Sequence, residues 1–248
     1  LKIFEEYGTK CTMTDFSKLL DYFRATYMSA SNQEILKRQL KDKVGNWWTK
    51  SLYGNRNVVV VCTDGNKTWD FSDGRHAAAR PAITYSEISS MCSEPVRREN
   101  GVLEVEYGEY PQMVVDENYS GELEEEFNNG NLKVTGKSYT TDSPCCFNEE
   151  FSPRKHIEYE YKGKKYIRFC KGLNHDGKNL HNLTKISEGI PFWVSVEPIT
   201  WLVDKKADIA LSEKIIFAGV QYKFSKFGMD DYDGDFDKTD IKQFMDTY

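Results

Sequence analysis

The chain has 248 residues, 39% of them hydrophobic and 14% aromatic, which is enough apolar material for one large domain or two small ones. Its 33 basic residues are outnumbered by 39 acidic ones, and the resulting net charge of −6 argues against general nucleic-acid binding, which requires a basic surface. Because no run of about 18 apolar residues occurs, the sequence predicts no membrane-spanning helix.

The six cysteines include no Cys-x-x-Cys pair, and the adjacent Cys145 and Cys146 suit neither a zinc site nor an unstrained disulfide. We therefore interpret the cysteines as reduced structural thiols, which is typical of a cytoplasmic protein. The opening residues LKIFEEYGTK lack the basic and apolar regions of a signal peptide. A cytoplasmic location is therefore expected.

In chain order, residues 12–27 predict a short helix, because Thr14 and Asp15 suit an N-cap and apolar residues then recur at helical spacing. Residues 31–44 are either one or two further helical turns or a long charged loop. The run NVVVVCT at 57–63 predicts a strand, and DGNKTWDF at 64–71 predicts a turn into the next strand.

The rest of the chain is dominated by strand patterns. Strands are predicted in VLEVEYGEYPQMVV (102–115), PFWVSVEPITWLVD (191–204) and ADIALSEKIIFAGV (207–220), and a hairpin in HIEYEYKGKKYIRFC (156–170). The acidic GELEEEF run at 121–127 is interpreted as a solvated face. A second helix is predicted after the cap formed by Thr239 and Asp240. The fold class expected from these patterns is α+β.

Five short motifs together carry a family resemblance. They are GEYPQ at 108–112, EPITWLVDKKADIALSEKIIF at 197–217, TDIKQFMDTY at 239–248, WWTKS at 47–51 and AARPAI at 78–83. Their combination resembles bacterial domains related to the formylglycine-generating enzyme, which have a C-type-lectin-like fold. The resemblance implies a mixed sheet with two short helices, and it covers about two thirds of the chain.

The motifs occur here in exchanged order relative to that family. The closing half lies at 1–90, a connector at 91–106 and the opening half at 107–248, with an insertion at about 113–185. This order indicates either a circular permutation of one domain or a cut across two tandem copies. We favour a single permuted domain over 1–248, since such folds bring their two ends together. The arrangement predicts that Trp47–Trp48 and Ile199–Trp201 lie in neighbouring strands of one sheet.

The resemblance also implies where a ligand binds. In C-type-lectin-like domains the corresponding loops form the ligand surface, and in the variable proteins of diversity-generating retroelements such positions are rewritten. The predicted ligand-binding residues are Tyr53, Asn55, Arg56, Asn57, Asn66, Lys67, Trp69, Asp70, Ser72, Asp73 and His76. Alternatively, the asparagines and glycines of this stretch only form turns. The Trp47–Trp48 pair is expected in the core, because one of two adjacent strand residues faces inward.

Two further sets of residues suggest metal chemistry. The acidic loop near the end contains Asp231, Asp233, Asp235 and Asp237, and alternating aspartates can supply oxygens to calcium. Its spacing does not follow the EF-hand pattern, so a solvated acidic loop is the preferred interpretation. His175 and His181 flank a turn. We interpret this segment as a loop that carries two polar rings rather than as a pair of metal ligands.

The leading functional prediction is a non-enzymatic domain that recognises a protein or a glycan, with no cofactor. The formylglycine-generating enzymes hold copper with two cysteines near the domain end, whereas only Cys62 lies in the matching half here, so their oxidase chemistry is not expected. The alternatives are a metal-assisted enzyme with a site near His175 and His181 or the acidic loop, and a purely structural module.

Overall fold

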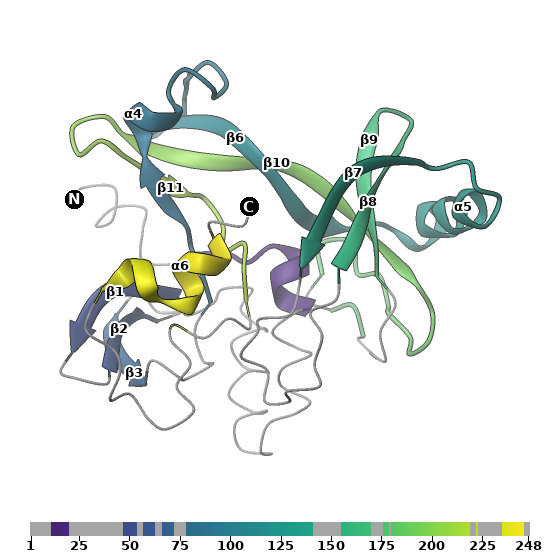
Figure 1. The fold of residues 1–248 in the computed structure, drawn as a ribbon, viewed down its shortest axis with the longest axis horizontal. Helices are drawn as coiled ribbons and strands as arrows, with labels where there is room; N and C mark the ends of the chain where they lie inside the picture. Colours follow the sequence, from purple (N-terminus) through teal and green to yellow (C-terminus); the bar gives the residue numbers. More distant parts are fainter. Residues whose placement is uncertain are drawn as a thin grey trace.

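The computed structural model describes residues 11–19, 47–53, 57–62, 66–71, 78–140, 155–169, 176–178, 180–218, 222 and 235–245. In these residues the predicted α+β class is confirmed, because two sheets are combined with several short helices (Figure 1). Strand pairing is antiparallel throughout the described sheets, and the parallel contacts are isolated bridges such as Met13 to Ile215. The expected mixed sheet is therefore replaced by antiparallel ones. The 31–44 segment lies outside the described residues.

The larger sheet has eight strands arranged around one long central strand. The strands are β4 (Ala82–Thr84), β5 (Val96–Arg97), β6 (Leu103–Val114), β7 (Lys133–Thr140), β8 (Lys155–Tyr161), β9 (Lys164–Phe169), β10 (Phe192–Asp204) and β11 (Ile209–Ser212). β6 pairs with β10 along most of its length, while β9 and β11 share the opposite edge of β10. Figure 1 shows β6 and β10 running side by side across the molecule, with the β8–β9 hairpin towards one end.

The sequence of β10 explains its central position. Val194 and Val196 face the main core, whereas Trp193 faces the opposite side of the sheet, where it is fully buried. Trp201 and Val203 are buried in a separate cluster near the other end of the strand. A strand with apolar residues on both faces requires cover on both sides, and therefore lies in the sheet interior.

The smaller sheet consists of β1 (Trp47–Tyr53), β2 (Asn57–Val61) and β3 (Lys67–Phe71), in that order. Val58 and Val60 of β2 are buried in the main core, and Val59 between them is only partly buried. This alternation is expected for a strand with one face towards the core. The strand predicted in the NVVVVCT run is confirmed as β2, and the strand predicted to follow it is confirmed as β3.

The described helices are short. They are α4 (Tyr85–Ile88), α5 (Glu117–Asn128), the 3₁₀ helix η2 (Phe236–Lys238), α6 (Asp240–Met245) and a helical turn over 15–19. Caps were predicted correctly, since Thr14 Oγ1 accepts from the Ser17 N–H at 3.1 Å and Thr239 Oγ1 from the Lys242 N–H at 3.2 Å. No helix in the described part of the chain is long and apolar enough to cross a membrane.

Two helices were predicted from the sequence, and α4 and α5 were not among them. The acidic run assigned to a solvated face forms most of α5. This helix has an apolar stripe at four-residue spacing, in which Leu123 is buried and Tyr119 and Phe127 are partly buried. Asp116 caps its N-terminus by accepting from the Tyr119 N–H at 3.0 Å. The stripe packs on Trp193 of β10, while the glutamates between its members point to solvent or to basic partners.

A single core joins the two sheets. Residues from β1, β2, the 15–19 turn, β6, β9 and β10 belong to one buried cluster, so the first part of the chain packs on the rest. However, Trp47–Trp48 and Ile199–Trp201 do not lie in neighbouring strands. β1 is bordered by β2 and by a bridge to Ala78, and β10 by β6, β9 and β11. The edges of both strands are already occupied, so the two cannot pair.

Candidate functional site

The structure describes part of the predicted ligand-binding set. Side chains are described for Asn57, Asn66, Lys67 and Trp69, and only the backbone for Tyr53 in β1 and Asp70 in β3; Asn55, Arg56, Ser72, Asp73 and His76 lie outside the described residues. The described members lie on neighbouring strands of the small sheet, with Tyr53 in β1, Asn57 in β2, Lys67, Trp69 and Asp70 in β3, and Asn66 directly before β3.

Trp69 is the most prominent member of this group. Its position in β3 is opposite Val59 of β2, on the face of the small sheet that points away from the core. The side chain is 48% exposed, and Asn66 and Lys67 beside it are also exposed. Asn57 lies on the same face two positions before Val59 and is partly buried. An exposed indole with polar neighbours is thus present on the predicted surface.

The tryptophan pair in β1 belongs to the core, as expected, but both rings are buried rather than one. Trp47 and Trp48 are each 5% exposed. The Arg80 guanidinium lies 5.4 Å from the ring centre of Trp47, and Trp48 packs on Tyr222 at 5.9 Å between ring centres. The two faces of β1 are both covered, so neither tryptophan contributes to a ligand surface.

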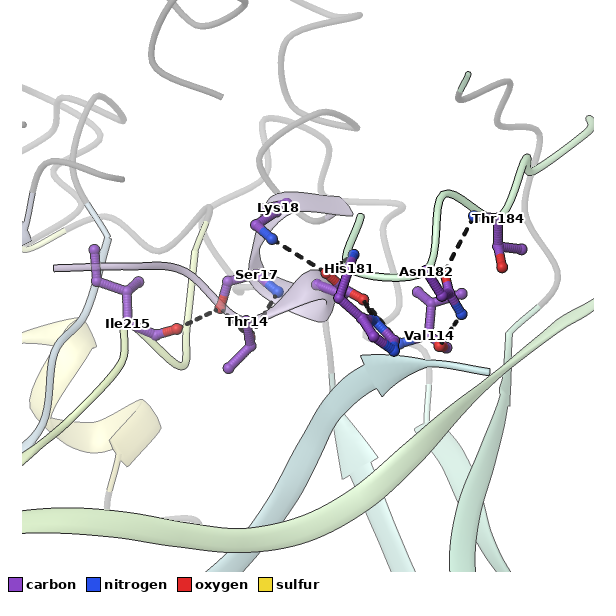
Figure 2. Close-up of polar contacts among 9 residues, drawn as sticks. Thr14, Ser17, Lys18, Val114, His181, Asn182, Thr184 and Ile215 are labelled. Atoms are coloured by element: carbon purple, nitrogen blue, oxygen red, sulfur yellow. Dashed lines mark hydrogen bonds and ion pairs between the residues drawn. The ribbon is translucent and has the colours of Figure 1, made fainter. Parts of the chain in front are cut away.

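A second polar site lies between the two parts of the chain, around the carboxylate of Asp15 (Figure 2). Asp15 Oδ1 accepts from Lys18 Nζ and from the His181 backbone N–H, each at 3.1 Å. Asp15 Oδ2 accepts from the Val114 N–H at 3.3 Å and forms a short contact with His181 Nδ1. Each oxygen therefore has two partners, and the carboxylate is fully satisfied.

Local structure holds each partner of Asp15 in place. The Thr14 cap orients the helical turn, and Ser17 Oγ of that turn donates to backbone oxygens of Ile215 and Ile216. Asn182 Nδ2 donates to the Val114 carbonyl at 2.8 Å, which ties the loop after His181 to the end of β6. The carboxylate thus fastens three separate segments to one another.

Burial at this site is uneven. The side chain of Asp15 is fully buried and that of Lys18 is only 6% exposed, whereas the side chain of His181 is 45% exposed. A buried carboxylate requires hydrogen bonds and an opposite charge to offset its lost hydration, and Lys18 supplies that charge. The imidazole therefore has one edge on the buried carboxylate and the rest of the ring towards solvent.

The histidine prediction is changed by this arrangement. His181 was expected to share a turn with His175, which lies outside the described residues, and its observed partner is Asp15 instead. The two residues are separated by 166 positions, so spacing along the sequence gave no signal of their contact. The capping role assigned to Thr14 and Asp15 was the nearest indication, because it placed Asp15 at the start of a helix.

The acidic loop is described only at its end. Asp231 and Asp233 lie outside the described residues. Asp235 accepts from the Asp237 N–H at 3.1 Å and pairs with Lys238 at 3.4 Å, so it caps η2. Among the described residues no group of three or more histidine, cysteine or acidic side chains is placed to hold a metal. Calcium binding by this loop stays a prediction.

Two cysteines of the described segments, Cys11 and Cys92, are free thiols. Cys11 is buried, and its Sγ donates to the Glu213 carbonyl at 3.2 Å. Burial raises the pKa of the Cys11 thiol to about 11, against a smaller opposite effect of the Arg80 charge. A thiol with so high a pKa is a poor nucleophile at neutral pH, which fits a structural role.

These sites stand without support from relatives. Comparison of the chain with protein-family models, with curated proteins and with solved structures finds no match. The functional conclusions below therefore rest on the chemistry of the sites themselves.

Proposed function

We propose that this chain is a recognition domain of C-type-lectin-like architecture, which binds a protein or glycan ligand through the outer face of β2 and β3. The observation that carries the proposal is the exposure of Trp69. All five tryptophans of the chain are described, and the other four are at most 5% exposed. Trp69 is thus the most exposed of the five tryptophans.

The energetic argument favours a binding role for this side chain. Covering the exposed half of an indole would remove about 100 Å² of apolar surface from water, worth about 2–3 kcal/mol. Trp69 lies on the face of the small sheet away from the core, where about half of it is exposed. Tryptophan is also enriched at binding hot spots, where polar neighbours such as Asn66 and Lys67 supply orientation.

The exchanged order of the two halves is part of the proposal. Contacts between the first 90 residues and the rest support it: the Ala79 N–H donates to the Phe217 carbonyl at 2.8 Å, and the Ile215 N–H to the Thr12 carbonyl at 2.9 Å. One shared core is what a permuted domain requires. A cytoplasmic or phage-associated recognition protein, with sequence diversified around Trp69, is the form that we propose.

The test begins with the fluorescence of Trp69. Iodide quenches exposed indoles, so the fraction of tryptophan fluorescence open to iodide is expected to fall close to zero in Trp69→Ala. Oligosaccharides and displayed peptides that bind the wild type should protect the fluorescence from iodide. Binding of these ligands is expected to weaken by about 2 kcal/mol or more in Trp69→Ala, as for an aromatic hot spot.

A matched control separates this role from general surface hydrophobicity. Ile157 of β8 is 45% exposed, close to the value for Trp69, and lies in the other sheet. Ile157→Ala is expected to bind as the wild type does. The proposal fails if the combined alanine replacement of Tyr53, Asn57, Trp69 and Asp70 leaves binding to every ligand of the panel intact.

A further inference from the structure

We infer that His181 and Asp15 form an acid–base site that hydrolyses an acyl ester, which goes beyond recognition by the Trp69 surface and does not depend on it. The inference begins with the state of the imidazole. Asp15 accepts from Lys18, from the backbone of Val114 and from the backbone of His181, and a carboxylate bonded in this way offers only acceptors. The proton in its contact with His181 therefore belongs to Nδ1.

The same contacts fix the direction of the ring. Asp15 binds His181 twice, through the backbone N–H at 3.1 Å and through Nδ1, so the backbone and the side chain are both held. With the proton on Nδ1, the lone pair of the neutral ring is on Nε2. Within the described residues Nε2 makes no hydrogen bond, and the side chain is 45% exposed. Figure 2 shows His181 close to Val114 at the end of β6.

A neutral imidazole oriented by a buried carboxylate is a prepared proton acceptor. In the proposed reaction, a water oxygen attacks the carbonyl carbon of the ester while Nε2 takes a proton from that water. The carbon–oxygen bond to the leaving alcohol then breaks, and the imidazolium returns the proton to the leaving oxygen. The products are a carboxylic acid and an alcohol, and His181 regains its starting form.

Asp15 acts in this scheme as a positioning residue. It does not touch the ester, and it stabilises the imidazolium that forms during the attack. Lys18 lies 3.1 Å from Oδ1 on the side of the carboxylate away from Nδ1, so its charge offsets that of Asp15 before the imidazole is protonated. Replacing the Asp15 carboxylate is thus expected to change which imidazole nitrogen of His181 carries the proton.

The first experiment measures the tautomer directly. Proton–nitrogen NMR correlations of the wild-type imidazoles at neutral pH distinguish a protonated Nδ1 from a protonated Nε2, and the spectrum of His181→Asn assigns the resonances among the four histidines. We expect the Nδ1–H form in the wild type and a shift towards the Nε2–H form in Asp15→Asn. An Nε2–H ring in the wild type would overturn the inference, even if Asp15→Asn does not fold.

The second experiment measures hydrolysis of p-nitrophenyl acetate. The side-chain amide of His181→Asn places a nitrogen at the position of Nδ1, so the hydrogen bond to Asp15 is kept while Nε2 is removed. The wild type is expected to release nitrophenolate about a hundredfold faster than this variant, the lower range for general-base catalysis. Equal rates for two proteins of equal thermal stability would overturn the inference. Ile157→Ala, as the control, should hydrolyse at the wild-type rate.

Discussion

Burial of Cys11 makes the stability of this protein sensitive to alkaline pH in a way that one substitution can isolate. Cys11 is 1% exposed, and burial raises the pKa of its thiol from the ordinary value of 9.0 to about 11 in the folded protein. The folded chain therefore keeps its proton at a pH where the unfolded chain has lost it. Such a group stabilises the fold fully below about pH 9, and its contribution is lost as the pH rises from there to about 11.

The size of this effect follows from the two pKa values. A difference of about two units corresponds to about 3 kcal/mol when the titration is complete, and to about 1 kcal/mol at pH 10. Cys11→Ala removes the titrating group. The variant is less stable than the wild type at about pH 8 because it lacks a buried sulfur. The difference in the free energy of unfolding between the two proteins should be smaller by about 1 kcal/mol at about pH 10.

Urea unfolding of both proteins at the two pH values measures the difference in their free energy of unfolding. Tyrosines and lysines also titrate in this range, but they are common to both proteins and cancel in the difference. Cys92→Ala is the matched control, since its thiol is only partly buried. A gap between wild type and Cys11→Ala that stays constant from about pH 8 to about pH 10 would refute the reasoning.

Two further substitutions test the packing around the sites. Leu123→Ala removes the fully buried side chain by which α5 packs on the sheet, and should cost about 2–5 kcal/mol in urea unfolding; a loss below about 1 kcal/mol would contradict this packing. Gly177→Ala would place a Cβ 2.3 Å from the Leu183 carbonyl oxygen, in the loop that carries His181, at a φ of +77°. Gly177→Ala should therefore lower the thermal unfolding temperature more than Gly163→Ala does. Gly163 has a similar φ of +74° but open space around an added Cβ. Equal decreases in the unfolding temperature of the two variants would show that only φ matters.

Features decided by neighbouring residues could be predicted from the sequence. The caps at Thr14 and Thr239, the β2 strand and the β8–β9 hairpin with its turn at Lys162–Gly163 all depend on contacts within a few positions. The strand that contains Trp69 was predicted from a local pattern of the same kind, whereas its place on a ligand surface was implied by the family resemblance. Two local elements, α4 and α5, were not predicted. In α5 the glutamates between the apolar residues made the segment resemble a solvated acidic run.

Tertiary structure alone decided which distant segments meet. The sequence placed tryptophans in β1 and β10 but could not show that the edges of both strands are filled by other partners. It contained Asp15 and His181 without indicating their contact, since no periodicity links residues 166 positions apart. Local pattern fixes which face of an element is apolar. Only the packing of those faces around a common core fixes which polar side chains are buried between them.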